Sequence, residues 1–139
     1  RLLDEDAGSL KVVASHGLSD AFLEKGSISS TETARRALNG ETIVISDATT
    51  DDRIVFQDAM KSEGIVSAIV TPILARDQVI GIMRLYSAVQ REFPSDFMVM
   101  VEALAHQGGL AIQNASMFLK LQEDKKSLEE DIWSHRSWF

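Results

Sequence analysis

Two neighbouring runs of apolar residues, 66–74 and 78–87, give the clearest structural pattern in the chain. Nearly every position in both runs is apolar, which is typical of strands in a sheet that is covered on both faces. Between them, Ala75-Arg76-Asp77 predicts a tight turn that joins the two strands as an antiparallel hairpin. The pattern therefore predicts an α+β fold with a central antiparallel sheet and helices on both faces.

Shorter apolar segments between turn residues predict the other elements of the domain. Strands are expected at 1–3, 10–16 and 42–45, and helices at 20–25 and 52–62. The first two strands form a hairpin with a polar tip. Between the two helices, Ser29 or Ser30 is expected to cap a further helix, which Asn39-Gly40 ends because both residues tolerate a left-handed backbone.

A long final helix is expected to begin at Pro94 and Ser95, with Ser95 as the N-cap. From residue 111 onward a seven-residue repeat can be written, which is typical of helices that pair as a coiled coil. Its positions are Ala111, Asn114, Phe118, Leu121, Lys125, Leu128, Ile132 and His135. We expect a homodimer through the apolar members of this seam, while its polar members fix register and partner number.

Composition narrows the classes of function. The 139 residues suit one domain, and 14 basic against 21 acidic residues give a net charge of −7, which argues against a nucleic-acid reader. No apolar run approaches the ~18 residues of a membrane span. The chain has no cysteine, which excludes disulfides, thiolate metal sites, thioether-linked chromophores and nucleophilic thiols. This absence fits a reducing cytosol, so we expect a cytoplasmic location.

Several segments in a fixed order resemble the GAF family. Residues 64–73 (GIVSAIVTPI) and 79–85 (VIGIMRL) resemble its central strands. Upstream, residues 37–47 and 51–53 are similar to its helix, glycine turn, strand and loop, and residues 104–115 are similar to its exit helix. The resemblance covers about residues 2–121 and implies a PAS-like regulatory module that senses a small molecule, dimerises, or does both.

The resemblance also sets the expected domain limits. A GAF-like domain is expected at 1–118, without the first helix and most of the first strand of the family, followed by a helical extension at 119–139. Arg1 opens the chain inside an apolar stretch, so we expect the chain to be part of a longer protein.

The family's ligand pocket implies a candidate site between the sheet and residues 45–65. The residues expected to bind a ligand there are Phe56, Met60, Ile65, Ser67, Ile69, Arg84 and Tyr86, with Thr71, Met83 and Leu85 nearby. Each of these side chains could equally be an ordinary part of the core. Arg84 stands out, because a charge among apolar strand residues needs a partner. Either an aspartate from residues 47–58 pairs with it, or it contacts an anion or carboxylate of the ligand.

Other candidate sites have simpler explanations. Asp47, Asp51, Asp52 and Asp58 lack the spacing of a calcium-binding loop, and helix capping by Asp51 or Asp52 explains them better than a metal. Among the histidines, His16 and His106 could ligate haem, but neither has a histidine partner one helical turn away. At the chain end, Trp133, Trp138 and Phe139 are either partner contacts or a frayed terminus.

Known ligands of the family can be tested against the residues present. Members that bind cyclic GMP carry an Asn-Lys pair that this chain lacks, so that mode of binding is not expected. Members that bind bilins or reduce free methionine sulfoxide use cysteine, which is absent. The cofactor therefore stays unknown. No serine elbow or phosphate loop is present, so we expect no enzyme.

Two functions stay open, with a catalytic domain as a remote third. The first is a sensor that binds a small ligand and passes the change through a paired exit helix. The second is a ligand-free dimerisation and relay module. The output domain could be a histidine kinase, a cyclic-dinucleotide enzyme or a transcriptional activator.

Overall fold

The computed structural model describes residues 1–24 and 31–136. Within these residues, five strands form one antiparallel sheet in the order β2-β1-β5-β4-β3. The strands are β1 (Leu2–Asp4), β2 (Ser9–Lys11), β3 (Ile43–Ile45), β4 (Ser67–Ala75) and β5 (Gln78–Ser87). The helices are α1 (Asp20–Glu24), α2 (Glu32–Leu38), α3 (Gln57–Glu63) and α4 (Ser95–Arg136). The predicted α+β fold with a central antiparallel sheet is confirmed.

The β4–β5 hairpin is the centre of the sheet. Its two-residue turn has positive φ at both Arg76 (49°) and Asp77 (63°), the conformation that matches the twist of the flanking strands. From Ala75 opposite Gln78, the pairing extends to Ser67 opposite Ser87. The hairpin and its turn are therefore confirmed where the sequence predicted them.

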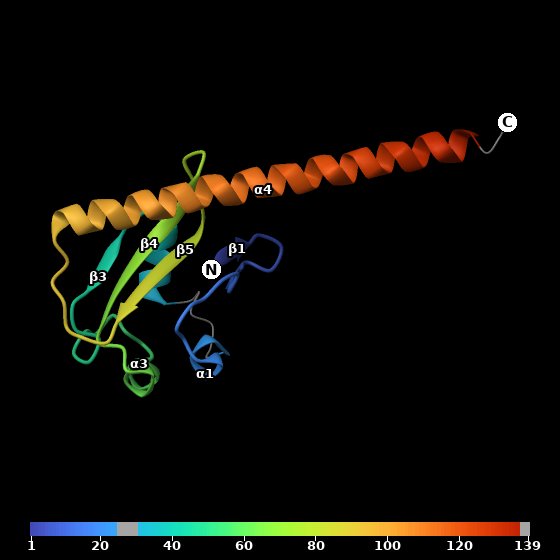
Figure 1. Cartoon of the computed structure of the whole chain (residues 1–139). Coiled ribbons are helices and arrows are strands. Elements are labelled where there is room, and N and C mark those ends of the chain that lie inside the picture. The colour runs from blue at the N-terminus through green and yellow to red at the C-terminus, as the bar shows by residue number, and fades with distance from the viewer. Residues whose placement is uncertain (25–30, 137–139) are drawn as a thin grey trace.

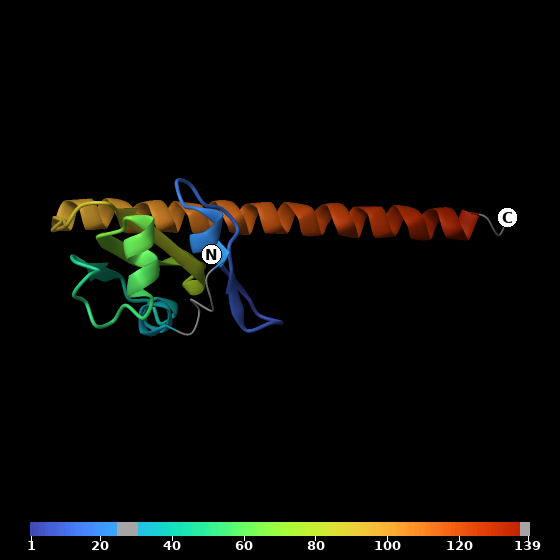
Figure 2. The same cartoon turned by 90° about the horizontal axis from the view of Figure 1, so that it is seen from below.

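The two faces of this hairpin are covered by different helices. Ala68 and Val70 pack with Ala34 and Ala37 of α2 in one buried cluster. The alternate residues of β4 face α4, which lies across the opposite side of the sheet (Figure 1 and Figure 2). Helices α1 and α3 lie beside each other below the strands in Figure 1.

Helix α4 has 42 residues, and only its first part lies on the sheet (Figure 1). Val101 and Ala105 are buried there, whereas residues 114–135 are all exposed. The long predicted helix is confirmed. No helix within residues 1–24 and 31–136 is both long and apolar enough to cross a membrane.

Two elements differ clearly from their predicted limits. The strand predicted at 10–16 ends at Lys11, because Val12 and Val13 have no partner strand among the described residues and stay exposed. The helix predicted from residue 52 begins only at Gln57, since the preceding residues form a turn described below.

The N-cap of α2 is Thr31, whose hydroxyl accepts a 3.3 Å hydrogen bond from the Ala34 backbone nitrogen. The caps predicted at Ser29 and Ser30 lie outside the described residues, as do Trp138 and Phe139.

Candidate ligand site

A cavity of about 670 Å³ lies at one end of the sheet. Its wall is built from β5, from α1, from the end of α3 and from the segment that links β2 to α1. A second cavity of about 50 Å³ lies between the sheet and residues 53–60. Phe22, Arg84 and Tyr86 line both cavities, so these three side chains lie where the two meet. The volume of the larger cavity is in the range of sites that bind small molecules.

An aromatic pair forms part of the shared wall. The rings of Phe22 on α1 and Tyr86 on β5 meet edge to face, with centroids 5.6 Å apart and an interplanar angle of 89°. Phe22 is buried and packs with Ala59 and Ile65 in a small apolar cluster. The pair attaches α1 to the sheet, and this attachment gives the cavity a fixed apolar side.

Arg84 brings a charge to the same wall. It stands opposite Val70 in the β4–β5 register, on the face that also holds Ile82 and Tyr86. Its Nε and Nη2 atoms are buried and have no hydrogen-bond partner among the described residues. Burial lowers the pKa of the guanidinium, and the neighbouring Tyr86 side chain only partly offsets that shift. A buried guanidinium with unmet donors destabilises the ligand-free protein.

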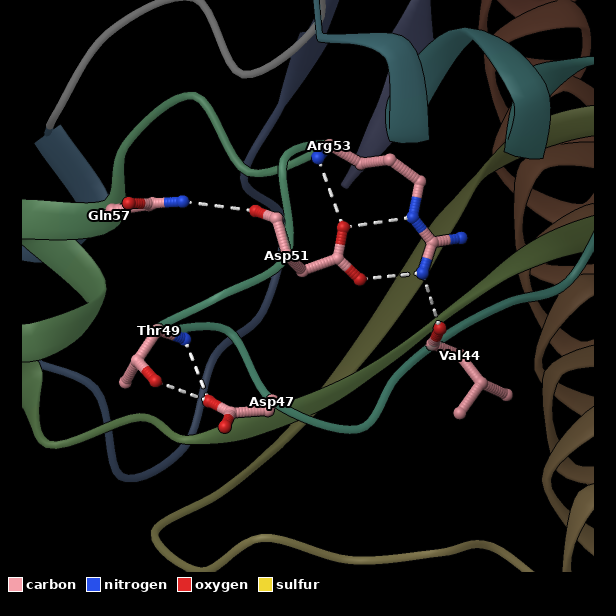
Figure 3. Close-up of polar contacts among 6 residues, drawn as sticks. All are labelled: Val44, Asp47, Thr49, Asp51, Arg53 and Gln57. Carbon is pink, nitrogen blue, oxygen red and sulfur yellow. Dashed lines mark hydrogen bonds and ion pairs between the residues drawn. The ribbon is translucent and has the colours of Figure 1, made fainter.

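The aspartates of residues 47–58 do not supply the expected partner for Arg84. Asp51 instead binds Arg53, with Oδ1 accepting from Nε at 3.0 Å and Oδ2 from Nη2 at 2.7 Å (Figure 3). The same Nη2 donates to the Val44 carbonyl oxygen at 2.9 Å, which attaches the loop to β3. The predicted ion pair between Arg84 and this loop is therefore wrong, because a nearer arginine occupies Asp51.

The capping role expected for Asp51 is also wrong. Its Oδ1 accepts from the Arg53 backbone nitrogen at 3.0 Å, and its carbonyl oxygen accepts from Gln57 Nε2 at 3.0 Å (Figure 3). These bonds hold a turn, while α3 starts after Phe56 without a side-chain cap. Hydrogen bonds from Arg53 hold the pKa of Asp51 below its usual value. Asp47 likewise accepts from the Thr49 backbone nitrogen and hydroxyl, which lowers the pKa of that carboxyl.

A carboxylate joins the two helices at the cavity. Glu63, at the end of α3, accepts from the Ser19 backbone nitrogen and hydroxyl, each at 2.6 Å. The Ser19 hydroxyl oxygen in turn accepts from the Phe22 backbone nitrogen at 3.2 Å. The two bonds from Ser19 lower the pKa of Glu63. Both carboxylate oxygens are thus used to hold α1 in place.

The structure distributes the predicted ligand-binding residues unevenly. Phe56 and Met60 line the small cavity and Ile65 lines the large one, while Arg84 and Tyr86 line both. Leu85 also lines the large cavity.

Ser67 and Ile69 line neither of these cavities. Both are fully buried on the face of β4 that is turned toward α4, and the Ser67 hydroxyl donates to the Val89 carbonyl oxygen at 2.8 Å. Thr71 and Met83 share that face by their register, and the Thr71 hydroxyl lies 2.9 Å from that of Thr42.

Sequence reasoning missed the N-terminal contribution to the large cavity. Arg1, Phe22 and Glu63 line it and were not singled out from the sequence, whereas His16, which was considered as a ligand contact, lines it too. The sequence offers no pattern that would have found Arg1, Phe22 and Glu63, because they come from a strand end and two short helices that meet only in the folded chain. His16 and His106 are both exposed. Within the described residues, no group of three or more acidic or histidine side chains is placed to hold a metal ion.

A family model described as "GAF domain" matches residues 1–113. The chain belongs to the GAF domain family. GAF domains are regulatory sensory domains, and the sheet, cavities and exit helix described above are this domain's version of that fold. A search of curated proteins finds no match.

Solved GAF structures share the fold of this domain. A domain assigned to a two-component sensor histidine kinase of Sinorhizobium meliloti 1021 is 23% identical, with a TM-score of 0.72, over 87% of this chain and 81% of that one. The blue-light absorbing form of the Thermosynechococcus elongatus PixJ GAF domain is 14% identical, with a TM-score of 0.66, over 88% of this chain and 77% of that one. A GAF domain from an Acinetobacter phosphoenolpyruvate-protein phosphotransferase is 18% identical, with a TM-score of 0.66, over 86% and 71%. At these identities the likeness concerns the fold alone.

Proposed function

We propose that this GAF domain is a sensory unit of a cytoplasmic signalling protein, which binds a small molecule reversibly and passes the change through a paired α4. The observation that carries the proposal is the cavity of about 670 Å³, whose wall combines the Phe22–Tyr86 pair with two Arg84 donors that lack an acceptor in the described part of the chain. Such a mixture of apolar walls and a few polar groups suits a small organic ligand. The role is regulatory rather than catalytic.

The route from ligand to output follows from the two faces of the hairpin. Arg84 and Tyr86 face the cavity, and the neighbouring residues of the same strands face α4. A ligand that moves the wall therefore acts on the sheet against which α4 packs. It changes the output only if it binds two arrangements of the domain with different affinity.

Pairing of α4 with a second copy is supported by the exposed side of the helix. The seam residues Phe118 and Leu121 are 61% and 65% exposed, and Leu128 and Ile132 are exposed as well. The same seven-residue spacing continues upstream through the exposed Leu104, on the side of α4 opposite the sheet. A seven-residue repeat that is continuous along one helix is self-complementary, so the occupant that fits it is an identical helix. In this proposal, the paired α4 passes the change on to an output domain.

The test uses the lack of cysteine, because Ser127→Cys introduces the only thiol and so a single spin label. Metabolites are first screened for a rise in Tm, and distances between labels in the dimer are then measured with and without each compound that binds. We expect at least one such compound to change the distance distribution. A bound compound that leaves the distribution unchanged would contradict the relay.

A second candidate function is a ligand-free dimerisation and relay module, which the exposed seam alone would support. It predicts that the dimer forms and that no compound in the screen raises Tm. Both observations together would favour it over the sensor.

A further inference from the structure

Within the proposed sensory function, the structure also indicates the chemical class of the ligand. We propose that the larger cavity binds small organic carboxylates, with the Arg84 guanidinium taking the carboxylate and the apolar wall taking the rest of the molecule. The inference rests on the proposed function. The experiment has one outcome that overturns the carboxylate ligand alone and another that also counts against the sensory function.

The charge of the cavity opposes the charge of the chain. The protein carries a net charge of −7, yet Arg1 and Arg84 both line the large cavity. Glu63 is the one acidic side chain among the described residues of that wall, and Ser19 occupies both of its oxygens. An anion in this cavity therefore meets an excess of positive charge within a protein that repels anions elsewhere.

Arg84 has two buried donor atoms without an acceptor among the described residues, whereas Nε and Nη2 of Arg53 both have acceptors. Arg53 lines the small cavity, but Asp51 and the Val44 carbonyl oxygen occupy its guanidinium. The Nε and Nη2 atoms of Arg84 form the edge that matches a carboxylate bidentately, and no described residue accepts from either atom. The Arg84 side chain lines both cavities, and in this proposal rotation of its outer bonds brings the edge to a ligand in the larger one.

The rest of the wall favours a carboxylate with an apolar body over a bare phosphate. Phe22, Leu23 and Ile65 present apolar surface to the same space as Arg84. A phosphate group usually needs several convergent donors, such as backbone N–H groups at the start of a long helix, whereas α1 has only five residues. One guanidinium beside an aromatic edge suits a single carboxylate on an aromatic or branched aliphatic body.

The experiment titrates the full chain with benzoate, phenylacetate, 4-methylpentanoate and octanoate, and in parallel with the amide of each acid and with inorganic phosphate. Binding is followed by calorimetry and by the ¹H–¹⁵N signals of the arginine Nε–H groups, where the Arg84 signal is assigned from its loss in Arg84→Met. We expect at least one acid to shift the Arg84 signal and to bind at least about tenfold more tightly than its amide.

The variants separate charge recognition from a general effect on the fold. Arg84→Met should weaken binding of the acid by roughly 10- to 100-fold and leave binding of the amide unchanged. Arg84→Lys should retain part of the affinity, and Arg35→Met, at an exposed position of α2, should retain all of it.

The outcomes are distinct. Equal affinity for acids and amides, or acid binding that survives Arg84→Met, overturns the carboxylate assignment and leaves the sensory function standing. Phosphate that shifts the Arg84 signal while all four acids fail overturns it in favour of a phosphate ligand. If acids, amides and phosphate all leave the Arg84 signal and the calorimeter unchanged, the carboxylate assignment is overturned and the proposed sensory function loses its cavity ligand as well.

Discussion

The backbone of α4 touches the backbone of β4 at Gly109 and Leu74. A β-carbon on Gly109 would overlap the Leu74 carbonyl oxygen and stand 2.8 Å from the carbonyl carbon. Neither atom is the end of a flexible side chain, so neither can move aside without shifting the strand or the helix. Close approach of this kind needs a residue without a side chain.

Gly109→Ala should therefore destabilise the domain, by about 1–3 kcal/mol or more, because helix and sheet must separate. Gly108→Ala is the matched control, since nothing lies within 4 Å of a β-carbon there. That change should be neutral or stabilising by roughly 0.5–1 kcal/mol, as alanine favours a helix interior. Urea unfolding followed by circular dichroism measures both. Equal effects of the two changes would refute the close contact.

Arg84→Met should stabilise the ligand-free domain while removing its charge from the cavity. Replacing a guanidinium that has two buried donors without an acceptor among the described residues by an apolar side chain of similar length removes a desolvation cost, and we expect a gain of about 1–3 kcal/mol. Arg35→Met at an exposed position should change stability by less than about 0.5 kcal/mol. The measurement is urea unfolding at pH 7 without added anions. A loss of stability in Arg84→Met would mean that the guanidinium is satisfied in the folded chain.

Leu121→Asp should convert a dimer into a monomer, because it places a charge in the seam of α4. Leu119→Asp is the matched control: Leu119 is 59% exposed and only two residues away in sequence, but lies outside the seven-residue repeat. Sedimentation equilibrium or light scattering of the full chain measures the mass. If both variants behave alike, the seam is not the dimer contact.

Asp51→Asn should lower stability at neutral pH by about 1–2 kcal/mol, because it removes a charge-assisted pair that holds the loop to β3. Arg53 holds the folded-state pKa of Asp51 below its unfolded value of about 4. This contribution is thus fully present above that unfolded pKa and is lost as the pH falls through the folded one. The difference between wild type and Asp51→Asn should shrink toward zero in acid. Asp52→Asn, at the exposed next position, should show neither effect.

Glu63→Gln should loosen α1 without unfolding the sheet, because a neutral amide cannot accept both bonds from Ser19 as strongly as the carboxylate. Faster hydrogen exchange is expected in residues 19–24, with β4 unchanged. The pKa of Glu63 is lowered, so the wild type should show the same loosening only below the usual glutamate range, as protonation of the carboxylate proceeds. Slow exchange of α1 in Glu63→Gln would show that Phe22 alone holds the helix.

The hairpin and the long helix could be predicted closely because their patterns are local. Residues 78–87 were expected to form a strand, and β5 spans the same residues, since an unbroken apolar run between turn residues determines a strand by itself. The start of α3 could not be predicted in this way. The apolar residues of 52–62 together predict one helical face, but the bonds between Asp51 and Arg53 stabilise a turn before α3 begins.

The site could be predicted only in part, because β4 is apolar on both faces. Ile69 and Val70 look alike in sequence, and only the packing of α2 and α4 decides which one faces the cavity side. Arg84 was recognisable as a charge that needs a partner. That Asp51 would not pair with Arg84 was not predictable, because Arg53, two residues from Asp51, binds that carboxylate.

Because α4 is held against the sheet at Gly109, a small tilt of the helix there moves its far end by a larger distance. About 27 residues lie between Gly109 and the described end of the helix, a length of about 40 Å at the usual rise per residue. A tilt of about 5° at the contact would carry the far end by roughly 3–4 Å, which is more than half of a helical turn. Gly108 and Gly109 are adjacent at this contact, and a helix bends more easily at such a pair of small residues. A displacement of the sheet that is too small to alter the fold would thus move the far end of α4 by about the size of a side chain.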